Sequence, residues 1–272
     1  MAIYNSNQKR SKMPFIGGSA YMNNPRFYQA KAEIFSDGVM TRKTVNRALD
    51  ISFGVLVISA FIGWIFTPVA KNVSSSITVS AVSSAFSLVL VISAIASLVL
   101  AIVVAIQSMP KPILVVLYSA AEGMLVGSIS KTYEAAYQGI IITAVLATIC
   151  VVAASYFVYR TGIIKVNQKF LRFLFVASIA YIAFSLVNVV LVVVGVFSGY
   201  GLFATQFGPF ISVFAIVLGA LMLVSDFAIV DQGINAGAPA QFSWKCAFGI
   251  MLSVIWIYFE ILRLLAVMRD SK

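Results

Sequence analysis

The sequence of 272 residues is 61% hydrophobic and only 10% charged, and its mean hydropathy is +1.00. A soluble protein has about 25% charged residues, so this composition excludes an ordinary soluble domain and indicates a chain that lies in the lipid bilayer. The formal net charge is +10, and histidine is absent. The absence of histidine excludes a Ser-His-Asp hydrolase and a histidine-ligated zinc enzyme, and we expect no enzyme activity.

Residues 1–48 form a polar, basic segment that we predict to be cytoplasmic and disordered in its first part. The segment has no short apolar run with a small-residue cleavage site, so no removable signal peptide is predicted. No aromatic-rich nucleic-acid motif accompanies its basic residues, so we expect no nucleic-acid partner and interpret them as a topology signal. They are Lys9, Arg10, Lys12, Arg26, Lys31, Arg42, Lys43 and Arg47.

Seven apolar runs follow and define a predicted transmembrane domain over residues 49–268. Each run is near the roughly 20 residues that a helix needs to cross the hydrocarbon core. The pattern predicts an all-α membrane protein, a bundle of seven transmembrane helices. The approximate bounds of the runs are 49–67, 82–107, 113–130, 138–159, 170–197, 209–230 and 246–267.

The distribution of Lys and Arg predicts the orientation of this bundle. If the N-terminus is cytoplasmic and all seven runs cross, the inside segments hold 14 of these residues and the outside segments hold 4. Because cytoplasmic segments retain Lys and Arg, we predict a multi-pass protein of the plasma membrane with its N-terminus in the cytoplasm. A re-entrant seventh run is the alternative. It would return Arg269 and Lys272 to the inside, which fits the rule better.

Ionisable residues inside the runs are functional candidates, because a charge at the centre of a membrane helix costs about 2.5–3.5 kcal/mol on insertion scales. Glu122 lies within the third run, in LYSAAEGMLVGSIS. Gly123 and Gly127 have the small-xxx-small spacing that lets a neighbouring backbone approach closely. We predict that Glu122 binds a proton or a cation. A protonated glutamate that hydrogen-bonds a neighbouring helix is the structural alternative.

One aspartate lies toward the end of the sixth run and a second follows it directly. We predict Asp226 near the inner end of its span, about one turn from the loop, where it is either an ion-binding group or a solvated interfacial carboxylate. Asp231 is five residues further on, about 140° round a helix, so the two do not share a face. We predict that Asp231 lies in the loop, in contact with water.

The seventh run carries Glu260 and Arg263, which are spaced i,i+3 and so lie on one helical face. Trp256 marks the same face, which we predict to point into the bundle. The two charges either neutralise each other or take part in ion binding, and both interpretations stay open. Asn188 in the fifth run is predicted to make an interhelical hydrogen bond.

These residues resemble those of the Bax inhibitor family, also called transmembrane Bax-inhibitor-motif or YccA-like membrane proteins, and most closely its bacterial branch. The resemblance covers about residues 105–268. It rests on the order and spacing of YSAAEGMLVGSIS, YEAAYQGIIITA, LVSDFAIVDQGINAGAP and WKCAFGIMLSVIWIYFEILRLLAVMR. It implies a seven-helix bundle in which the other six helices surround the last one. It also implies a pH-sensitive calcium leak that is governed by a pair of acids on the sixth and seventh helices.

Carried over by position, the resemblance assigns the sixth-helix acid to Asp226 and the seventh-helix acid to Ser253, which is not an acid. Glu260 lies two turns further along, so either it takes this role at a different depth or the switch is absent. The family also has an arginine on the second helix. The second run here has no basic residue, and Arg263 is the nearest substitute.

Two functions stay open. The first is a pH-sensitive leak or channel for Ca²⁺ or H⁺, in which buried carboxylates supply the several oxygen ligands that calcium prefers. The carboxylates are Glu122, Asp226 and Glu260, and the pairing or gating candidates are Arg263, Asp231 and Ser253. Apart from possible Ca²⁺, we expect no cofactor. The second function is a non-conducting scaffold, or a regulator of a membrane protease or of a stress response, in which the acids are structural.

Overall fold

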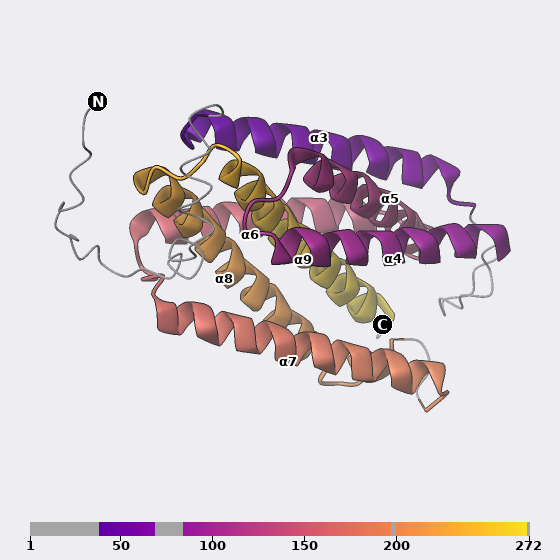
Figure 1. Ribbon diagram of the computed structural model, residues 1–272. Coiled ribbons are helices and arrows are strands. Elements are labelled where there is room, and N and C mark those ends of the chain that lie inside the picture. The colour runs from indigo at the N-terminus through magenta and orange to yellow at the C-terminus, as the bar shows by residue number, and fades with distance from the viewer. Residues whose placement is uncertain (1–37, 69–83, 197–199, 271–272) are drawn as a thin grey trace, which may run out of the picture.

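The computed structural model describes residues 38–68, 84–196 and 200–270. This part contains seven α-helices and one short 3-10 helix, and no strand (Figure 1). The prediction of an all-α protein is therefore confirmed, whereas the disorder predicted for the first residues lies outside the described part. The elements are α3 (Arg42–Phe66), α4 (Ser84–Ile106), α5 (Pro112–Ala136), α6 (Ile140–Thr161), α7 (Gln168–Val193), η2 (Gly201–Ala204), α8 (Gly208–Asn235) and α9 (Phe242–Asp270).

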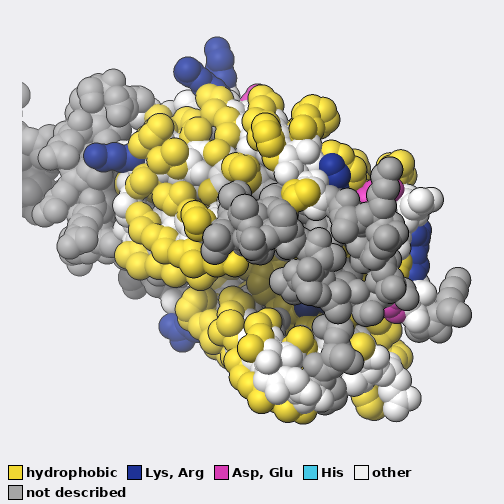
Figure 2. Space-filling model, turned by 90° about the vertical axis from the view of Figure 1, so that its right-hand side faces the viewer, with side chains coloured by type: hydrophobic (Ala, Val, Ile, Leu, Met, Phe, Trp, Pro, Cys, Tyr) yellow, Lys and Arg dark blue, Asp and Glu magenta, His cyan; other side chains and the backbone are white. Residues whose placement is uncertain are grey.

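Six of the described helices are long and apolar enough to cross a membrane: α3, α5, α6, α7, α8 and α9. The apolar stretch described in α4, Val91–Ile106, is shorter than these six helices. The chain is therefore a multi-pass membrane protein, and the seventh crossing remains a prediction. Hydrophobic side chains cover much of the described surface that Figure 2 shows, as expected for helices that face lipid tails.

Several helices extend beyond the apolar runs, because a membrane helix continues into the polar interface. α3 begins at Arg42 rather than at residue 49. Thr41 caps this helix start, because its side chain accepts a hydrogen bond from the Thr44 backbone N–H at 3.3 Å. α8 continues to residue 235 rather than ending near 230. Asp231 therefore lies on the helix, and the prediction that it lies in the loop is wrong. Asp226 lies more than two turns before the end of α8, rather than about one turn.

One end of the bundle, called the basic end here, contains the start of α3, the α4–α5 turn, the end of α6 and the α8–α9 turn. Arg42 lies 3.6 Å from Asp231, which joins the start of α3 to the end of α8. Lys245, near the start of α9, donates to the Val104 carbonyl near the end of α4 at 2.7 Å. Helices that follow one another in the sequence therefore run in opposite directions, as Figure 1 shows.

The opposite end brings the α5–α6 turn to the end of α9. The Tyr137 hydroxyl donates to the Asp270 carboxylate at 2.5 Å, and Arg269 donates to the Gln138 carbonyl at 2.8 Å. Burial, together with the hydrogen bond to Asp270, raises the pKa of Tyr137 to about 12. The hydroxyl therefore stays protonated at neutral pH and serves as the donor.

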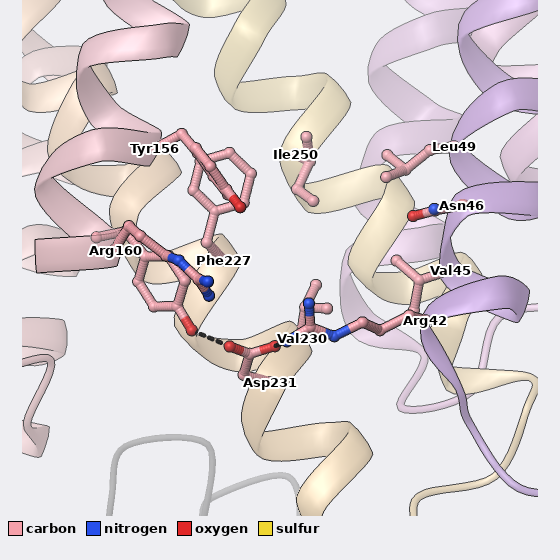
Figure 3. Close-up of a pocket in the computed structure, with 11 residues that line it drawn as sticks. Arg42, Val45, Asn46, Leu49, Tyr156, Arg160, Phe227, Val230, Asp231 and Ile250 are labelled. Carbon is pink, nitrogen blue, oxygen red and sulfur yellow. Dashed lines mark hydrogen bonds and ion pairs between the residues drawn. The ribbon is translucent and has the colours of Figure 1, made fainter. Parts of the chain in front are cut away.

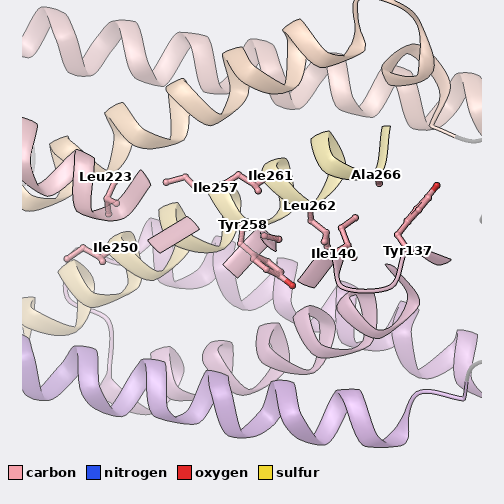
Figure 4. Close-up of a cluster of buried hydrophobic side chains, with 10 residues drawn as sticks. Tyr137, Ile140, Leu223, Ile250, Ile257, Tyr258, Ile261, Leu262 and Ala266 are labelled. Atoms are coloured by element: carbon pink, nitrogen blue, oxygen red, sulfur yellow. The ribbon is translucent and has the colours of Figure 1, made fainter. Parts of the chain in front are cut away.

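Helix α9 is the centre of the bundle. It packs against α3, α5, α6 and α8, and its side chains also contact α4 and α7. Over an apolar stretch of 18 residues, 61% of the residues are buried in α9, against 11% in α7. The buried cluster in Figure 4 is built mainly on α9, with Leu223 from α8 and Ile140 from α6 packed against it. The central position that the resemblance implies for the last helix agrees with this packing.

Helix α9 is also continuous over 29 residues, about 43 Å at 1.5 Å per residue. This length exceeds the roughly 30 Å of a hydrocarbon core. A re-entrant segment needs a turn within the membrane, and α9 contains none. By its length and composition α9 is therefore able to cross the membrane completely, and which of the two arrangements it adopts stays a prediction.

Glycines let α3 and α5 approach each other closely. A Cβ added at Gly123 would overlap the Ser59 side chain, and one added at Gly127 would overlap the Ala60 carbonyl oxygen. On the other helix, a Cβ at Gly63 would overlap the Met124 carbonyl oxygen. The close helix contact predicted from the small-xxx-small spacing is therefore confirmed, and the helix that packs against these glycines is α3.

Asn188 of the fifth run bonds another helix, as predicted, and its partner is the short helix η2. The Asn188 side-chain oxygen accepts from the Leu202 backbone N–H at 2.6 Å, and its amide donates to the Tyr200 carbonyl at 3.3 Å. Asn188 thus holds η2 and the turn before it against α7. This arrangement places Phe203 of η2 beside the charged residues of α9.

Candidate functional site

Asp226 and Ser253 join α8 to α9. The Ser253 hydroxyl donates to the Asp226 carboxylate at 2.6 Å. Ser253 is 2% exposed and Asp226 is half-buried. Gly249 lies one turn before Ser253, and a Cβ there would come within 3.1 Å of the carboxylate, so the glycine leaves room for it. The two positions to which the resemblance assigns the pair of acids therefore lie directly opposite each other.

Small residues and a thiol surround this carboxylate on the α9 side. Cys246 is buried and lies near Asp226, two turns before Ser253 on the same helix. Its neighbour Lys245 points away toward the end of α4, where its ammonium group donates to three carbonyl oxygens. The described contacts of Asp226 therefore contain a hydroxyl donor and no cation.

Glu260 and Arg263 form an ion pair two to three turns beyond Ser253. One carboxylate oxygen of Glu260 accepts from both the Arg263 guanidinium and the Tyr181 hydroxyl of α7, the latter at 2.8 Å. The guanidinium carbon lies 4.1 Å from the centre of the Phe203 ring, a cation–π contact. The pair faces into the bundle, between α9, α7 and η2.

The second oxygen of Glu260 is buried and has no hydrogen-bond partner among the described residues. Glu260 lines a recess of about 320 Å³ between α7 and α9, together with Tyr181, Ser185 and Trp256. The indole of Trp256 donates to the Ala215 carbonyl of α8 at 3.2 Å, which fixes this wall of the recess. Glu260 thus has one buried acceptor without a described partner and also lines this recess.

Tyrosines continue the polar region toward the end of the bundle opposite the basic end. Tyr133 of α5 lies close enough to Glu260 and Arg263 for electrostatic interaction. Its ring is centred 6.4 Å from that of Tyr200. Tyr200 is in turn a neighbour of Tyr137, which donates to Asp270. A row of hydroxyl groups therefore leads from the buried ion pair to the end of α9.

Glu122 lies apart from these groups. It is half-buried on α5, and the Ser97 hydroxyl of α4 lies beside it. Among the described residues, no group of three or more acidic or cysteine side chains could hold a metal ion. The described structure therefore does not bring Glu122, Asp226 and Glu260 together around one ion, and ion binding by each carboxylate stays a prediction. Each carboxylate has its own surroundings, and Glu260 is bonded to Arg263 and Tyr181 rather than to Asp226.

Asp231 belongs to a different cluster, at the basic end. It accepts a hydrogen bond from Tyr159 of α6 and lies 3.6 Å from Arg42 of α3. Its side chain is 36% exposed, so it lies at the edge of the bundle rather than free in water. Figure 3 shows Arg42 and Arg160 extending toward Asp231 from opposite sides of a recess.

Lys245 has a structural role that the sequence did not predict. Its ammonium group donates to the carbonyls of Val104, Ala105 and Gln107 at 2.7, 2.7 and 3.0 Å. Val104 and Ala105 lie in the last turn of α4 and Gln107 follows its last residue, and a cation at a helix C-terminus suits the helix dipole. The lysine and the helix end are about 140 residues apart, so no local pattern could have connected them.

Comparison with known proteins gives a match to a family model described as Bax inhibitor 1 like. The match covers residues 4–270, essentially the whole chain. Neither the curated proteins nor the solved structures that were searched gave a match.

Proposed function

Because the chain belongs to the Bax inhibitor 1 like family, we propose that this multi-pass membrane protein passes cations, Ca²⁺ or H⁺, under the control of Asp226. The observation that carries the proposal is the half-buried Asp226 carboxylate, which lies between α8 and the central helix α9 and accepts a hydrogen bond from Ser253. A carboxylate within a membrane-spanning bundle is a default functional candidate. It lies at the interface where a change of charge acts on two packed helices at once.

The proposed control works through the charge of one carboxylate. When Asp226 is ionised, it attracts a cation and accepts from the Ser253 hydroxyl. When it is protonated, the negative charge is lost, while the serine can still hydrogen-bond to the neutral group because a hydroxyl both donates and accepts. The contact between α8 and α9 therefore persists in both states, and the electrostatic attraction for a cation is what changes.

Serine in place of a second acid has a further consequence. Two carboxylates at this distance cannot both ionise freely, so they share a proton and titrate as a coupled pair. A carboxylate paired with a serine lacks that coupling. We therefore propose that this chain responds to pH through a single proton. Ser253→Asp should restore coupling and split the pH response into two steps that are spread over a wider pH range.

The proposed path has separate ion-binding carboxylates rather than one site in which several carboxylates bind the same ion. Asp226 lies toward the basic end, and Glu260 lies seven residues beyond Ser253, about 10 Å along α9. Calcium prefers several oxygen ligands, so a single carboxylate holds it weakly. Weak, successive sites suit passage better than storage, which favours a leak over a calcium buffer.

The proposed orientation places the basic end in the cytoplasm and Glu260 toward the outer side. The warrant is the excess of Lys and Arg in the segments at the basic end. A single cysteine at Thr205 in a variant without Cys150 and Cys246 should react with a membrane-impermeant maleimide added outside intact cells. Labelling that requires permeabilised cells would reverse the orientation.

A non-conducting scaffold, such as a regulator of a membrane protease, is the second candidate. It is favoured by the internal hydrogen bonds of the carboxylates, since Glu260 is bonded to Arg263 and Asp226 to Ser253. Paired charges can serve structure alone. In that case the recess beside Glu260 would have no transport role.

Flux through liposomes separates the two candidates. The purified full-length protein is reconstituted into vesicles that contain either a calcium indicator or a pH indicator, and the outside pH is varied from neutral to mildly acidic. The leak proposal predicts flux above that of protein-free vesicles, with a rate that changes with pH. Flux equal to that of empty vesicles at every pH, from protein that is folded and correctly inserted, would support the scaffold.

A further inference from the structure

Two recesses lie in the gap between α3 and α6, over helix α9. The first, the basic recess, has a volume of about 310 Å³ and contains Arg42, Asn46, Tyr159, Arg160 and Asp231 (Figure 3). The second, the apolar groove, has a volume of about 540 Å³, and its walls include Phe53, Val57, Phe61, Val145, Ile149 and Val254. Both α3 and α6 pack on α9, which forms the floor between them.

The two recesses follow one another along the same helix faces. On α3, Leu49 lines the basic recess and Phe53 lines the apolar groove, four residues apart and so about 6 Å along the axis. On α9, Ile250 and Val254 stand in the same relation. Residues spaced by four share a helical face. The recesses therefore follow one another from the basic end toward the middle of the bundle, and together they are called the α3–α6 groove here.

The basic recess carries a positive charge balance and unused donors. Arg42 and Arg160 face a single carboxylate, Asp231, which already accepts a hydrogen bond from Tyr159. The Arg42–Asp231 separation of 3.6 Å is too long for a hydrogen bond, so this pair leaves the guanidinium donors of Arg42 available. No described carboxylate lies within ion-pair distance of Arg160. A guanidinium fork matches the oxygens of a phosphate group, so a phosphate is the ligand chemistry that this end recognises.

The hydroxyl groups in the wall of the apolar groove are already hydrogen-bonded within the protein, so a ligand need not supply polar groups there. The hydroxyls of Ser130 and Tyr258 in its wall bond to each other at 2.6 Å, and the Thr148 hydroxyl donates to the Ala144 carbonyl at 2.7 Å. The remaining surface is hydrocarbon and aromatic. Its outer rim consists of exposed side chains such as Phe61 and Ile149, which face lipid. A hydrocarbon chain can therefore enter from the bilayer and fill this groove.

We propose that the α3–α6 groove binds an anionic phospholipid, with its phosphate at Arg42 and Arg160 and one acyl chain in the apolar groove. A phospholipid has charge at one end and hydrocarbon over the rest, and the groove has the same order from the basic end inward. A free phosphate would occupy the basic recess alone. A choline headgroup would bring a fixed cation beside two guanidinium groups, which disfavours a zwitterionic lipid. The bound lipid would bridge α3 and α6.

The test is native mass spectrometry of the full-length protein in detergent, titrated with dioleoyl phosphatidylglycerol. Dioleoyl phosphatidylcholine and inorganic phosphate are the comparison ligands. Arg160→Gln removes one guanidinium group, and Arg172→Gln, an exposed arginine of α7, is its control for net charge. Val145→Trp fills the apolar groove, and Ile142→Trp adds the same ring to a neighbouring lipid-facing position that is 69% exposed. Elution and melting temperature are measured for every variant.

The proposal predicts that phosphatidylglycerol binds at least about tenfold more tightly than phosphatidylcholine. Arg160→Gln should weaken phosphatidylglycerol binding about tenfold, in keeping with the loss of a charge-assisted hydrogen bond. Val145→Trp should reduce it similarly, and the two control variants should leave it unchanged.

Equal binding of the two lipids would overturn the proposal, as would equal losses in Arg160→Gln and Arg172→Gln, which indicate nonspecific attraction of the basic end. Competition by inorganic phosphate without any effect of Val145→Trp would also overturn it, because the site would then bind free phosphate.

Discussion

Removal of Arg263 is expected to destabilise the protein more than removal of the whole ion pair. The side chains of Glu260 and Arg263 are only 5% and 21% exposed, so both charges are largely out of water. In Arg263→Ala, Glu260 keeps its hydrogen bond from Tyr181 and loses its counterion, and its second oxygen is already without a described partner. Breaking a buried pair from one side costs about 3–5 kcal/mol. At about 2–4 °C per kcal/mol for a chain of this size, the melting temperature should fall by about 6–20 °C.

The double variant Glu260→Gln with Arg263→Met removes both charges and keeps most of the side-chain volume. Replacing a buried ion pair by neutral groups is often neutral in free energy, so we expect a loss of less than about 2 kcal/mol. The assay is thermal unfolding of detergent-solubilised protein by tryptophan fluorescence, at one fixed scan rate because unfolding of such proteins is often irreversible. Arg172→Ala, at an exposed position of α7, is the matched control and should change little.

The single and double variants could instead melt at the same temperature. That result would mean that the Glu260 carboxylate reaches water when its partner is removed. The account of Glu260 and Arg263 as a buried pair between α9, α7 and η2 would then be refuted.

Three further perturbations test other contacts. Gly127→Ala places a methyl group against the Ala60 carbonyl and should lower the melting temperature by several degrees, whereas Gly54→Ala, whose added carbon meets nothing within 4 Å, should leave it equal or higher. Lys245→Met removes three hydrogen bonds from the end of α4 and should speed amide exchange of the last turn of that helix, measured by mass spectrometry; unchanged exchange would contradict a capping role. Glu122→Gln should preserve folding and alter the ion dependence of liposome flux, and unchanged flux would remove Glu122 from the mechanism.

Much of the fold follows from the apolar runs, because a helix in lipid must satisfy its own backbone and its length is set by the bilayer. Each predicted run corresponds to a helix of the described structure, and the glycine spacing in the third run identified a close helix contact. The helix ends were less predictable. Hydropathy marks where the hydrocarbon core ends, whereas α8 continues past that limit and carries Asp231 on its last turns.

The candidate site was predictable only where its members lie on one helix. The spacing of Glu260 and Arg263 predicted that they share a helical face, because residues three apart on a helix are neighbours, and it left their pairing as one of two interpretations. Tyr181 and Phe203, which complete the surroundings of that pair, come from α7 and η2. Contacts of this kind depend on how the helices pack, which the periodicity of one segment does not contain. Only the family resemblance related Asp226 to Ser253, because it assigned the pair of acids to these two positions.

Control of the leak by Asp226 is the central claim, and the pH dependence of flux in Asp226→Asn tests it most directly. Wild-type and Asp226→Asn protein are reconstituted at equal density, and calcium flux is measured from neutral to mildly acidic pH. We predict that the wild-type rate changes with pH and that the Asp226→Asn rate is the same at every pH, since asparagine keeps the contact with Ser253 and cannot ionise. A full wild-type pH profile in the Asp226→Asn variant would contradict the account and place the control at another residue.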